Sequence, residues 1–418
     1  MGSLRRAVPS LVVVLAVGAV VGCGSDKSSS GGSSGSSSST GSSTTAASGA
    51  PASKGDLVFF VQTTIQSQFQ DLSEAVAGAK AAAQSINAAG GVNGQKVRIE
   101  FCDDHGTPAG ARNCAQQAVS KHAVAIQMTT NFSPSMWPIL TQAHIPAIGN
   151  NPFSESDLIN PDSYGQTPGT DTLLALSGYV AKNMGAKSLA VASYDVGTAI
   201  HNSEAEKDPT KQQGLDFKGI VSFPATTTDY GPIVQKLKST GADALSFVTA
   251  GQAVPPILQT AKQLGYTPKV VGNGTLQDPA TLKSGGALLE GMQIPSPVPA
   301  MSDPGLAEFR NDMAAAQKAG VADADKLDQT SVLPWLAVKG FAEVAKTMTK
   351  PITGANLIDA LNNTKDVKVS FLDWKPGVPG PKAKPRLANA SFWVVKVDNG
   401  KIVTASKPLD AYQILGAS

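Results

Sequence analysis

Histidine and cysteine are scarce in this sequence, with four and three residues respectively among 418. They lie apart from one another and do not show the spacings of metal ligands. The sequence also lacks a G-x-S-x-G elbow, an H-E-x-x-H pair, a C-x-x-C pair and a Walker loop. It therefore offers no catalytic constellation, and we expect no enzymatic activity, no metal and no cofactor.

Charged residues are also few, at 16% of the chain, and the net charge is only +2. Arg5 and Arg6 lie in a segment that we expect to be removed, which leaves 32 basic residues against 32 acidic ones. A chain without excess positive charge gives no reason to expect a nucleic-acid partner. Hydrophobic residues make up 41%, so a chain of this length can bury the cores of two or three domains.

Long hydrophobic runs are absent except at the N-terminus, where residues 11–21 are apolar but too short to span a bilayer comfortably. Arg5 and Arg6 precede this run, as in a secretory signal. The run ends in Val20-Val21-Gly22-Cys23, which resembles a bacterial lipobox with valine at its usual leucine position. We expect residues 1–22 to be a signal peptide and Cys23 to carry the lipid. The alternative is an ordinary secretory signal with an incidental cysteine.

The segment 23–55 consists almost entirely of serine, glycine, threonine and alanine after Cys23. Such a composition cannot bury a core and is typical of a flexible tether. We therefore expect the globular part to be tethered by lipid to the extracytoplasmic face of a bacterial cell membrane, which is its only contact with the membrane.

Residues 71–104 contain a helix, a tight turn and a strand in succession. The helix carries an apolar stripe at helical spacing, made of Leu72, Val76, Ala79, Ala83 and Ile86. Residues 96–101 alternate between charged and apolar side chains, as in a half-buried strand. Because the apolar segment 57–61 precedes the helix, the chain begins as strand, helix, strand, which predicts a parallel α/β sheet.

This alternation continues, with a second set of strands and helices that begins near residue 170. The strands are short and continuously apolar, which is typical of sheets covered on both faces. Three further helices are predicted at 304–319, 329–348 and 354–363. Two late strands flank Asp398-Asn399-Gly400, a strong hairpin signal.

The segment INAAGGVNGQKVRIEFCDD, residues 86–104, resembles the opening of the type I periplasmic binding proteins, in the leucine-binding-protein-like branch that serves branched-chain amino acid ABC importers. The matching order of elements covers nearly all of 56–410. The resemblance implies two lobes, each a parallel sheet with helices on both faces, joined by a hinge that the chain crosses near Thr167, Pro295 and Phe371. Lobe 1 is then 56–170 and 296–370, and lobe 2 is 171–295 and 371–418.

The same resemblance implies a monomer that binds a small-molecule solute between its lobes, closes by hinge motion, and delivers the solute to ABC permease subunits and their ATPase. Two alternatives remain open at this point. One is a ligand-sensing lipoprotein that signals to a membrane receptor. The other is a secreted α/β enzyme, which the missing catalytic constellation disfavours.

Ligands of open parallel sheets bind beyond the carboxyl ends of the strands. The polar and aromatic residues that follow the predicted strands are the candidates for ligand binding: Phe69, Gln70, Thr129, Thr130, Asn150, Asn151, Tyr194, Asp195, Gly251, Gln252 and Asn273. A helix capped by Ser133 would present free N–H groups to a ligand carboxylate. Residues of these types often only form turns.

The resemblance implies roles for some of these residues. Hydroxyls and backbone groups near 129–130 and 150–151 would hold the ligand's carboxylate and ammonium, and Phe69 would supply an aromatic ring. The family commonly pairs the ammonium with an acid in the loop matching 272–275, where this chain has none. We therefore expect a carboxylate-bearing solute, an amino acid or related compound, whose carboxylate matters more than its ammonium. The alternative is a standard amino-acid binder in which Asp195, from the neighbouring loop, pairs with the ammonium.

Cys102 ends a predicted strand and Cys114 lies early in the next helix, so the two can meet. An oxidising compartment favours a disulfide between them over two buried thiols. The neighbouring Asp103-Asp104-His105 is polar enough for a metal, but it resembles the family's structural acidic turn, and we expect that role.

Overall fold

The computed structural model of the protein describes residues 55–65, 67, 71–150, 152, 154–387 and 389–417. The expected signal peptide, Cys23 and all but the last residue of the tether lie outside this part of the chain, as do Phe69, Gln70 and Asn151. None of the described helices is long and apolar enough to cross a membrane.

The first lobe is built on a parallel sheet of strand order β2-β1-β3-β4-β5. Its strands are β1 (Leu57–Thr63), β2 (Val97–Asp103), β3 (Ala125–Met128), β4 (Ala147–Ile148) and β5 (Ser163–Tyr164). The helices that connect them are α1 (Glu74–Ala88), α2 (Pro108–Ser120), α3 (Trp137–Gln142) and α4 (Glu155–Ile159). The predicted strand–helix–strand opening is therefore confirmed, with β1 and β2 paired in register from Leu57 and Val97.

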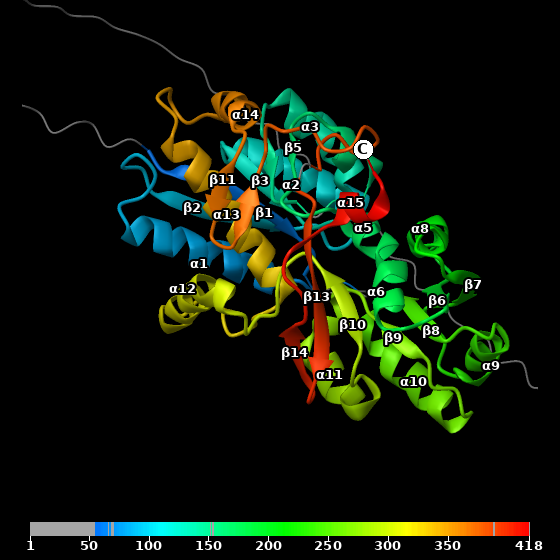
Figure 1. Ribbon diagram of the computed structural model, residues 1–418. Helices are drawn as coiled ribbons and strands as arrows, with labels where there is room; N and C mark the ends of the chain where they lie inside the picture. The colour runs from blue at the N-terminus through cyan, green and yellow to red at the C-terminus, as the bar shows by residue number, and fades with distance from the viewer. Residues whose placement is uncertain are drawn as a thin grey trace, which may run out of the picture. The chain divides into compact units, whose positions relative to one another are not determined.

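Side chains of β1 alternate between two cores on opposite faces of this sheet, as the period of a strand requires. Phe59 and Val61 lie in one core with α1 and three later helices, α12 (Ala307–Lys318), α13 (Gln329–Lys346) and α14 (Gly354–Asn363). Val58 and Phe60 lie in the other core with α2 and α3. Figure 1 shows α13 beside α1 although the two helices are far apart in sequence.

The second lobe contains a sheet of order β14-β13-β10-β9-β8-β6-β7, with β15 beside β13. Its strands are β6 (Ser188–Tyr194), β7 (Asp216–Phe223), β8 (Ala244–Val248), β9 (Lys269–Val271), β10 (Gln293–Ser296), β13 (Ser391–Asp398), β14 (Lys401–Thr404) and β15 (Leu409–Asp410). Its helices are α5 (Thr170–Ala175), α6 (Ser177–Asn183), α7 (Gly197–Glu204), α8 (Lys207–Gln212), α9 (Gly231–Ser239), α10 (Val254–Gln263), α11 (Pro279–Gly285) and α15 (Ala411–Leu415). This sheet is also covered on both faces, because Leu245 and Ala244 of β8 lie in separate cores.

The hairpin predicted around Asp398-Asn399-Gly400 is confirmed. Asp398 of β13 pairs with Lys401 of β14. The two turn residues have φ values of 50° at Asn399 and 70° at Gly400, the left-handed conformation that the common two-residue hairpin turn needs. β13 runs antiparallel to β10, so this late hairpin extends the second sheet.

The chain leaves the first lobe for the last time later than the expected crossing near Phe371. A short hairpin of β11 (Val367–Val369) and β12 (Leu372–Trp374) still belongs to the first core. Trp374 is fully buried there, and its indole N–H donates to the carbonyl of Gly165 at 2.9 Å. The return to the second sheet therefore follows Trp374, because this aromatic residue fixes the hairpin to the first lobe.

Cys102 and Cys114 are joined by a disulfide with their Cα atoms 5.5 Å apart, as expected. Both residues belong to the core between the first sheet and α2. The bridge thus ties the carboxyl end of edge strand β2 to the helix that covers it.

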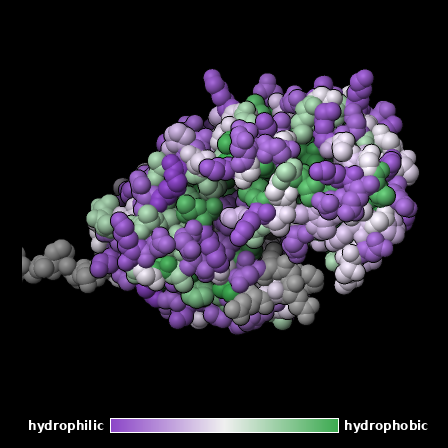
Figure 2. Space-filling view, turned by 90° about the horizontal axis from the view of Figure 1, so that it is seen from below, coloured by the Kyte–Doolittle hydropathy of each residue, from purple (hydrophilic) through white to green (hydrophobic). Residues whose placement is uncertain are grey.

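On the face seen in Figure 2, hydrophobic residues form small areas among hydrophilic ones.

Candidate functional site

A cavity of about 950 Å³ lies at the carboxyl ends of strands from both sheets. Thr129 follows β3, Tyr194 ends β6, Thr249 follows β8, and Asn273 follows β9; all four line the cavity. Parallel sheets place their ligands at this end, and the volume lies in the range of small-molecule sites. The geometry therefore defines one candidate site shared by the two lobes.

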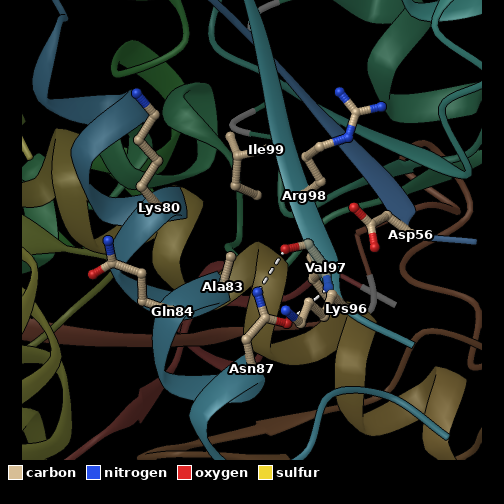
Figure 3. Close-up of a pocket in the computed structure, with 9 residues that line it drawn as sticks. All are labelled: Asp56, Lys80, Ala83, Gln84, Asn87, Lys96, Val97, Arg98 and Ile99. Atoms are coloured by element: carbon tan, nitrogen blue, oxygen red, sulfur yellow. Dashed lines mark hydrogen bonds between the residues drawn. The ribbon is translucent and has the colours of Figure 1, made fainter. Parts of the chain in front are cut away.

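A smaller cavity of about 300 Å³ lies between α1 and β2. Figure 3 shows Asn87 of α1 pointing toward Val97 at the start of β2, whereas Lys80 and Gln84 point away from that strand. Asn87 exchanges two hydrogen bonds with the backbone of Val97, at 2.9 and 2.8 Å. This cavity lies at the amino ends of the strands, where Asn87 braces the sheet edge, and it is not our candidate site.

Part of the wall of the larger cavity is apolar. Its apolar side chains come from both lobes: Leu72, Leu173, Leu174, Val196, Val248 and Leu333. Val196 is 45% exposed although it is a large aliphatic residue. Such a wall suits a solute with an aliphatic or aromatic part, because burying that part removes apolar surface from water on both sides.

Five of the predicted ligand-binding residues line the cavity: Thr129, Tyr194, Gly251, Gln252 and Asn273. Asn273 also holds its own loop, since its amide nitrogen donates to the carbonyl of Phe247 at 2.6 Å and its carbonyl oxygen accepts from Thr275. The hydroxyl of Thr129 accepts a hydrogen bond from Gln127 at 2.8 Å.

Three other predicted residues do not line the cavity. The hydroxyl of Thr130 donates to Asp104 at 2.6 Å, and the buried Asn150 donates to the hydroxyl of Ser163 at 3.2 Å. Asp195 is exposed and lies outside the wall. Asp195 therefore does not stand where it could replace the missing acid of the neighbouring loop.

Asp104 links the loops that follow three strands of the first sheet. Its carboxylate is fully buried and accepts hydrogen bonds from the side chains of Gln62, Thr64 and Thr130 at 2.9, 2.7 and 2.6 Å, and from the backbone N–H of Gly106. These contacts join the ends of β1, β2 and β3. They give the acidic turn at 103–105 a structural role, and no group of acidic, histidine and cysteine residues in the described chain is arranged to hold a metal.

The expected helix capped by Ser133 is wrong. Residues Ser133–Ser135 form a single 3₁₀ turn, and the six-residue α3 begins only at Trp137, without a side-chain cap. The reason is the buried Asp157, which accepts hydrogen bonds from Ser133 at 2.9 Å and from the indole of Trp137 at 2.8 Å. The proposed capped helix N-terminus for a ligand carboxylate is therefore absent here.

Sequence reasoning missed a pair of acids, Glu74 and Asp328, that line the cavity from the first lobe. Glu74 begins α1, and Asp328 caps α13 by accepting from the backbone N–H of Ser331 at 2.9 Å. The helices meet closely here, because a Cβ placed on Gly78 would lie only 1.8 Å from the carbonyl oxygen of Ser331. Glycine at 78 was the only local signal for this approach.

Burial raises the pKa of Glu74 to about 7, and the negative charge of Asp328 adds to the rise. Burial also raises the pKa of Asp328, with a contribution from the charge of Asp278 on the second lobe. The ammonium of Lys326 lies 3.9 Å from Glu74 but only 2.9 Å from Asp323. Lys326 therefore offsets the charge of Glu74 only in part.

A two-lobe α/β protein with a solute-sized cavity between its sheets belongs to the class of binding proteins. The sequence model of the family "Periplasmic binding protein" matches residues 61–401, and the chain belongs to this family. It is therefore a non-enzymatic, extracytoplasmic solute-binding protein of the type that serves ABC transporters. The alternative of a secreted enzyme is excluded by this membership.

Known proteins resemble the chain over most of its length. The "Leu/Ile/Val-binding protein homolog 3" of Brucella melitensis is 25% identical over 339 residues, which are 78% of this chain and 87% of that protein. A fatty acid ABC transporter substrate-binding protein from Thermomonospora curvata has a TM-score of 0.72 at 15% identity, covering 86% of this chain and 94% of that one. A solute-binding protein from R. palustris, solved with 4-hydroxybenzoate, has a TM-score of 0.67 at 20% identity, covering 85% and 96%. At these identities the two structures support the fold.

Proposed function

We propose that this protein is the lipid-anchored solute receptor of an ABC importer and acts as a monomer. It captures a small carboxylate-bearing solute, an amino acid or related compound, in the cavity between its lobes. The lobes then close around the solute and present it to the permease and its ATPase. The observation that carries the proposal is the cavity of about 950 Å³ lined by strand ends of both lobes.

The chemistry of the wall is compatible with such a solute. Thr129, Asn131 and Gln252 supply uncharged hydrogen-bonding groups for a carboxylate, and the apolar wall receives a side chain. Three relatives support the solute class by their names: one is named for leucine, isoleucine and valine, one for fatty acid, and one was solved with 4-hydroxybenzoate. All of these compounds carry a carboxylate.

Hinge closure requires connections that bend while the lobes stay rigid. The chain passes between the lobes in three segments, 165–169, 297–306 and 375–390. The last is fastened at Arg386, whose guanidinium lies 4.4 Å from the ring centre of Tyr164 and donates to the carbonyl of Ser163. We place the hinge in these segments, which assigns the lobes nearly as the sequence does.

Calorimetry with a panel of amino acids and simple carboxylic acids tests the binding function. We expect a subset of the panel to bind in a one-to-one ratio, and X-ray scattering to show a smaller radius of gyration with a bound member than without. Failure of every amino acid and carboxylic acid to bind would contradict the proposed solute class.

The lipid anchor has its own test in Cys23→Ala. Because the lipobox cysteine is the lipid acceptor, the variant is expected to be released to the medium or to remain unprocessed, as seen by cell fractionation and mass spectrometry. Ser28→Ala, a neighbouring change in the tether, is expected to remain membrane-bound. A correctly processed Cys23→Ala protein that stays on the membrane would refute the anchor.

A further inference from the structure

We propose that the cavity recognises its solute chiefly by a positively charged nitrogen, held by Glu74 and Asp328 of the first lobe, and that the solute's carboxylate is of secondary importance. The inference rests on the proposed solute-binding function but changes its solute class to organic cations, namely amines and amino acids with an apolar part. It reverses our expectation from the sequence, which rested on the acid missing from the loop 272–275.

The charge of the cavity wall points to a cation. Four carboxylates line it, namely Asp71, Glu74, Asp278 and Asp328, whereas no lysine, arginine or histidine of the described chain does so. The ammonium of Lys326 lies 3.9 Å from Glu74 but pairs more closely with Asp323, at 2.9 Å, so it offsets the charge of the wall only in part. An anionic solute entering this wall would therefore meet repulsion, whereas a cationic solute would be attracted.

Glu74 is the acid best suited to hold the cation. It is only 6% exposed, and its raised pKa reflects the cost of holding a charge there beside Asp328. A cation between the two carboxylates would remove that cost, since an opposite charge within contact distance favours the ionised form. The close approach at Gly78 and Ser331 keeps both acids in place, because Glu74 lies one helical turn before Gly78 and Asp328 lies three residues before Ser331.

Two polar atoms of the cavity wall also lack hydrogen-bond partners within the described chain. The side-chain oxygen of Gln329 and the hydroxyl of Thr249 are buried and have no hydrogen-bond partner among the described residues. Both residues line the cavity, and Thr249 is only 7% exposed. A buried polar atom without a partner is costly. The Gln329 oxygen can only accept and the Thr249 hydroxyl can accept or donate, so a ligand that donates hydrogen bonds, as an ammonium does, could satisfy both.

The two lobes also present like charges to each other. Asp328 belongs to the first lobe and Asp278 to the second, and the charge of Asp278 contributes to the raised pKa of Asp328. Closure without a solute brings these carboxylates together at a cost, and a bound cation removes the cost. Because the described chain has no metal-ligand group, the cation that fits is an organic ammonium, with the rest of the solute against the apolar wall.

Matched sets of probes test the proposal on the full chain. Each set contains an amino acid, its decarboxylated amine and its deaminated acid: leucine, 3-methylbutylamine and 4-methylpentanoate, with the corresponding sets for alanine and phenylalanine. In the set that binds, calorimetry is expected to give the amine an affinity within about tenfold of the amino acid. The deaminated acid is expected to bind at least about 30-fold more weakly.

Two substitutions probe the acids. Glu74→Gln and Asp328→Asn keep the size of each side chain, and asparagine still caps a helix. Each substitution is expected to lower the affinity for the amino acid and for the amine at least about tenfold. Glu343→Gln changes a partly exposed acid on the helix that Asp328 caps, and it is expected to change neither affinity by more than about twofold.

The outcomes separate this inference from the proposed function. Binding of a deaminated acid as tightly as its amino acid, without binding of the amine, would overturn the inference and leave the carboxylate-solute function intact. Binding of amines alone would support the inference and refute a carboxylate-bearing solute as the class that the protein binds. No binding by any amine or amino acid, or unchanged amino-acid affinity in both acid variants, would also overturn the inference.

Discussion

Replacing Asp104 with alanine is expected to lower the free energy of unfolding by about 4 kcal/mol. The carboxylate is fully buried and accepts hydrogen bonds from Gln62, Thr64, Thr130 and the N–H of Gly106. Alanine leaves these donors without an acceptor in a site closed to solvent. Urea unfolding followed by circular dichroism measures the change. The variant is also expected to bind solute more weakly, because the loop that carries Thr129 loses its support.

Two other variants serve as controls for Asp104→Ala. Thr130→Val removes one donor of the network and is expected to cost about 1 kcal/mol. Asp373→Ala removes an acid whose side chain is 65% exposed and is expected to change the stability by less than about 0.5 kcal/mol. If Asp104→Ala were no less stable than Asp373→Ala, the hydrogen bonds of Asp104 would not be what stabilises the ends of the three strands.

Glu206→Gln is expected to make the protein more stable than the wild type at alkaline pH. Glu206 is fully buried in the second lobe, where one of its oxygens accepts a hydrogen bond from the hydroxyl of Ser246 at 3.1 Å. Burial raises the pKa of Glu206 to about 8, so the folded protein keeps this carboxyl neutral at pH 7. Glutamine imitates the neutral acid and has no proton to lose.

The sign of the effect follows from proton linkage. The unfolded chain loses the Glu206 proton near the ordinary glutamate pKa, whereas the folded chain keeps it until about pH 8. Ionisation therefore favours the unfolded state between these pH values, and the wild type loses stability as the pH rises through this window. Between pH 5.5 and pH 8, the glutamine variant is expected to gain roughly 3 kcal/mol relative to the wild type.

Urea unfolding of both proteins at several pH values measures this difference. Glu204→Gln, an exposed acid two residues earlier, is expected to follow the wild-type pH dependence. A Glu206→Gln protein whose stability runs parallel to that of the wild type from pH 5.5 to pH 8 would show that Glu206 is ionised in the folded state.

The parts of the fold that follow local patterns were predictable from the sequence. Period-two alternation and glycine-bounded helices gave the first sheet, and Asn399-Gly400 gave the late hairpin, because such signals depend on neighbouring residues alone. Where a distant residue competes with a local preference, prediction failed. Ser133 is a favourable helix cap by type, but the buried Asp157 takes its hydroxyl, and the helix starts four residues later.

The candidate site divides in the same way. The sequence by itself determined that polar loop residues such as Thr129 and Asn273 follow the strands, since parallel sheets direct these ends to one side. Only the tertiary structure decided the charge of the cavity, because Glu74 and Asp328 are far apart in the chain and meet through the contact of two helices at Gly78 and Ser331. A local stretch of sequence determines secondary-structure propensity and hydrophobic periodicity. The electrostatic field at a site depends instead on all the charges that packing brings together.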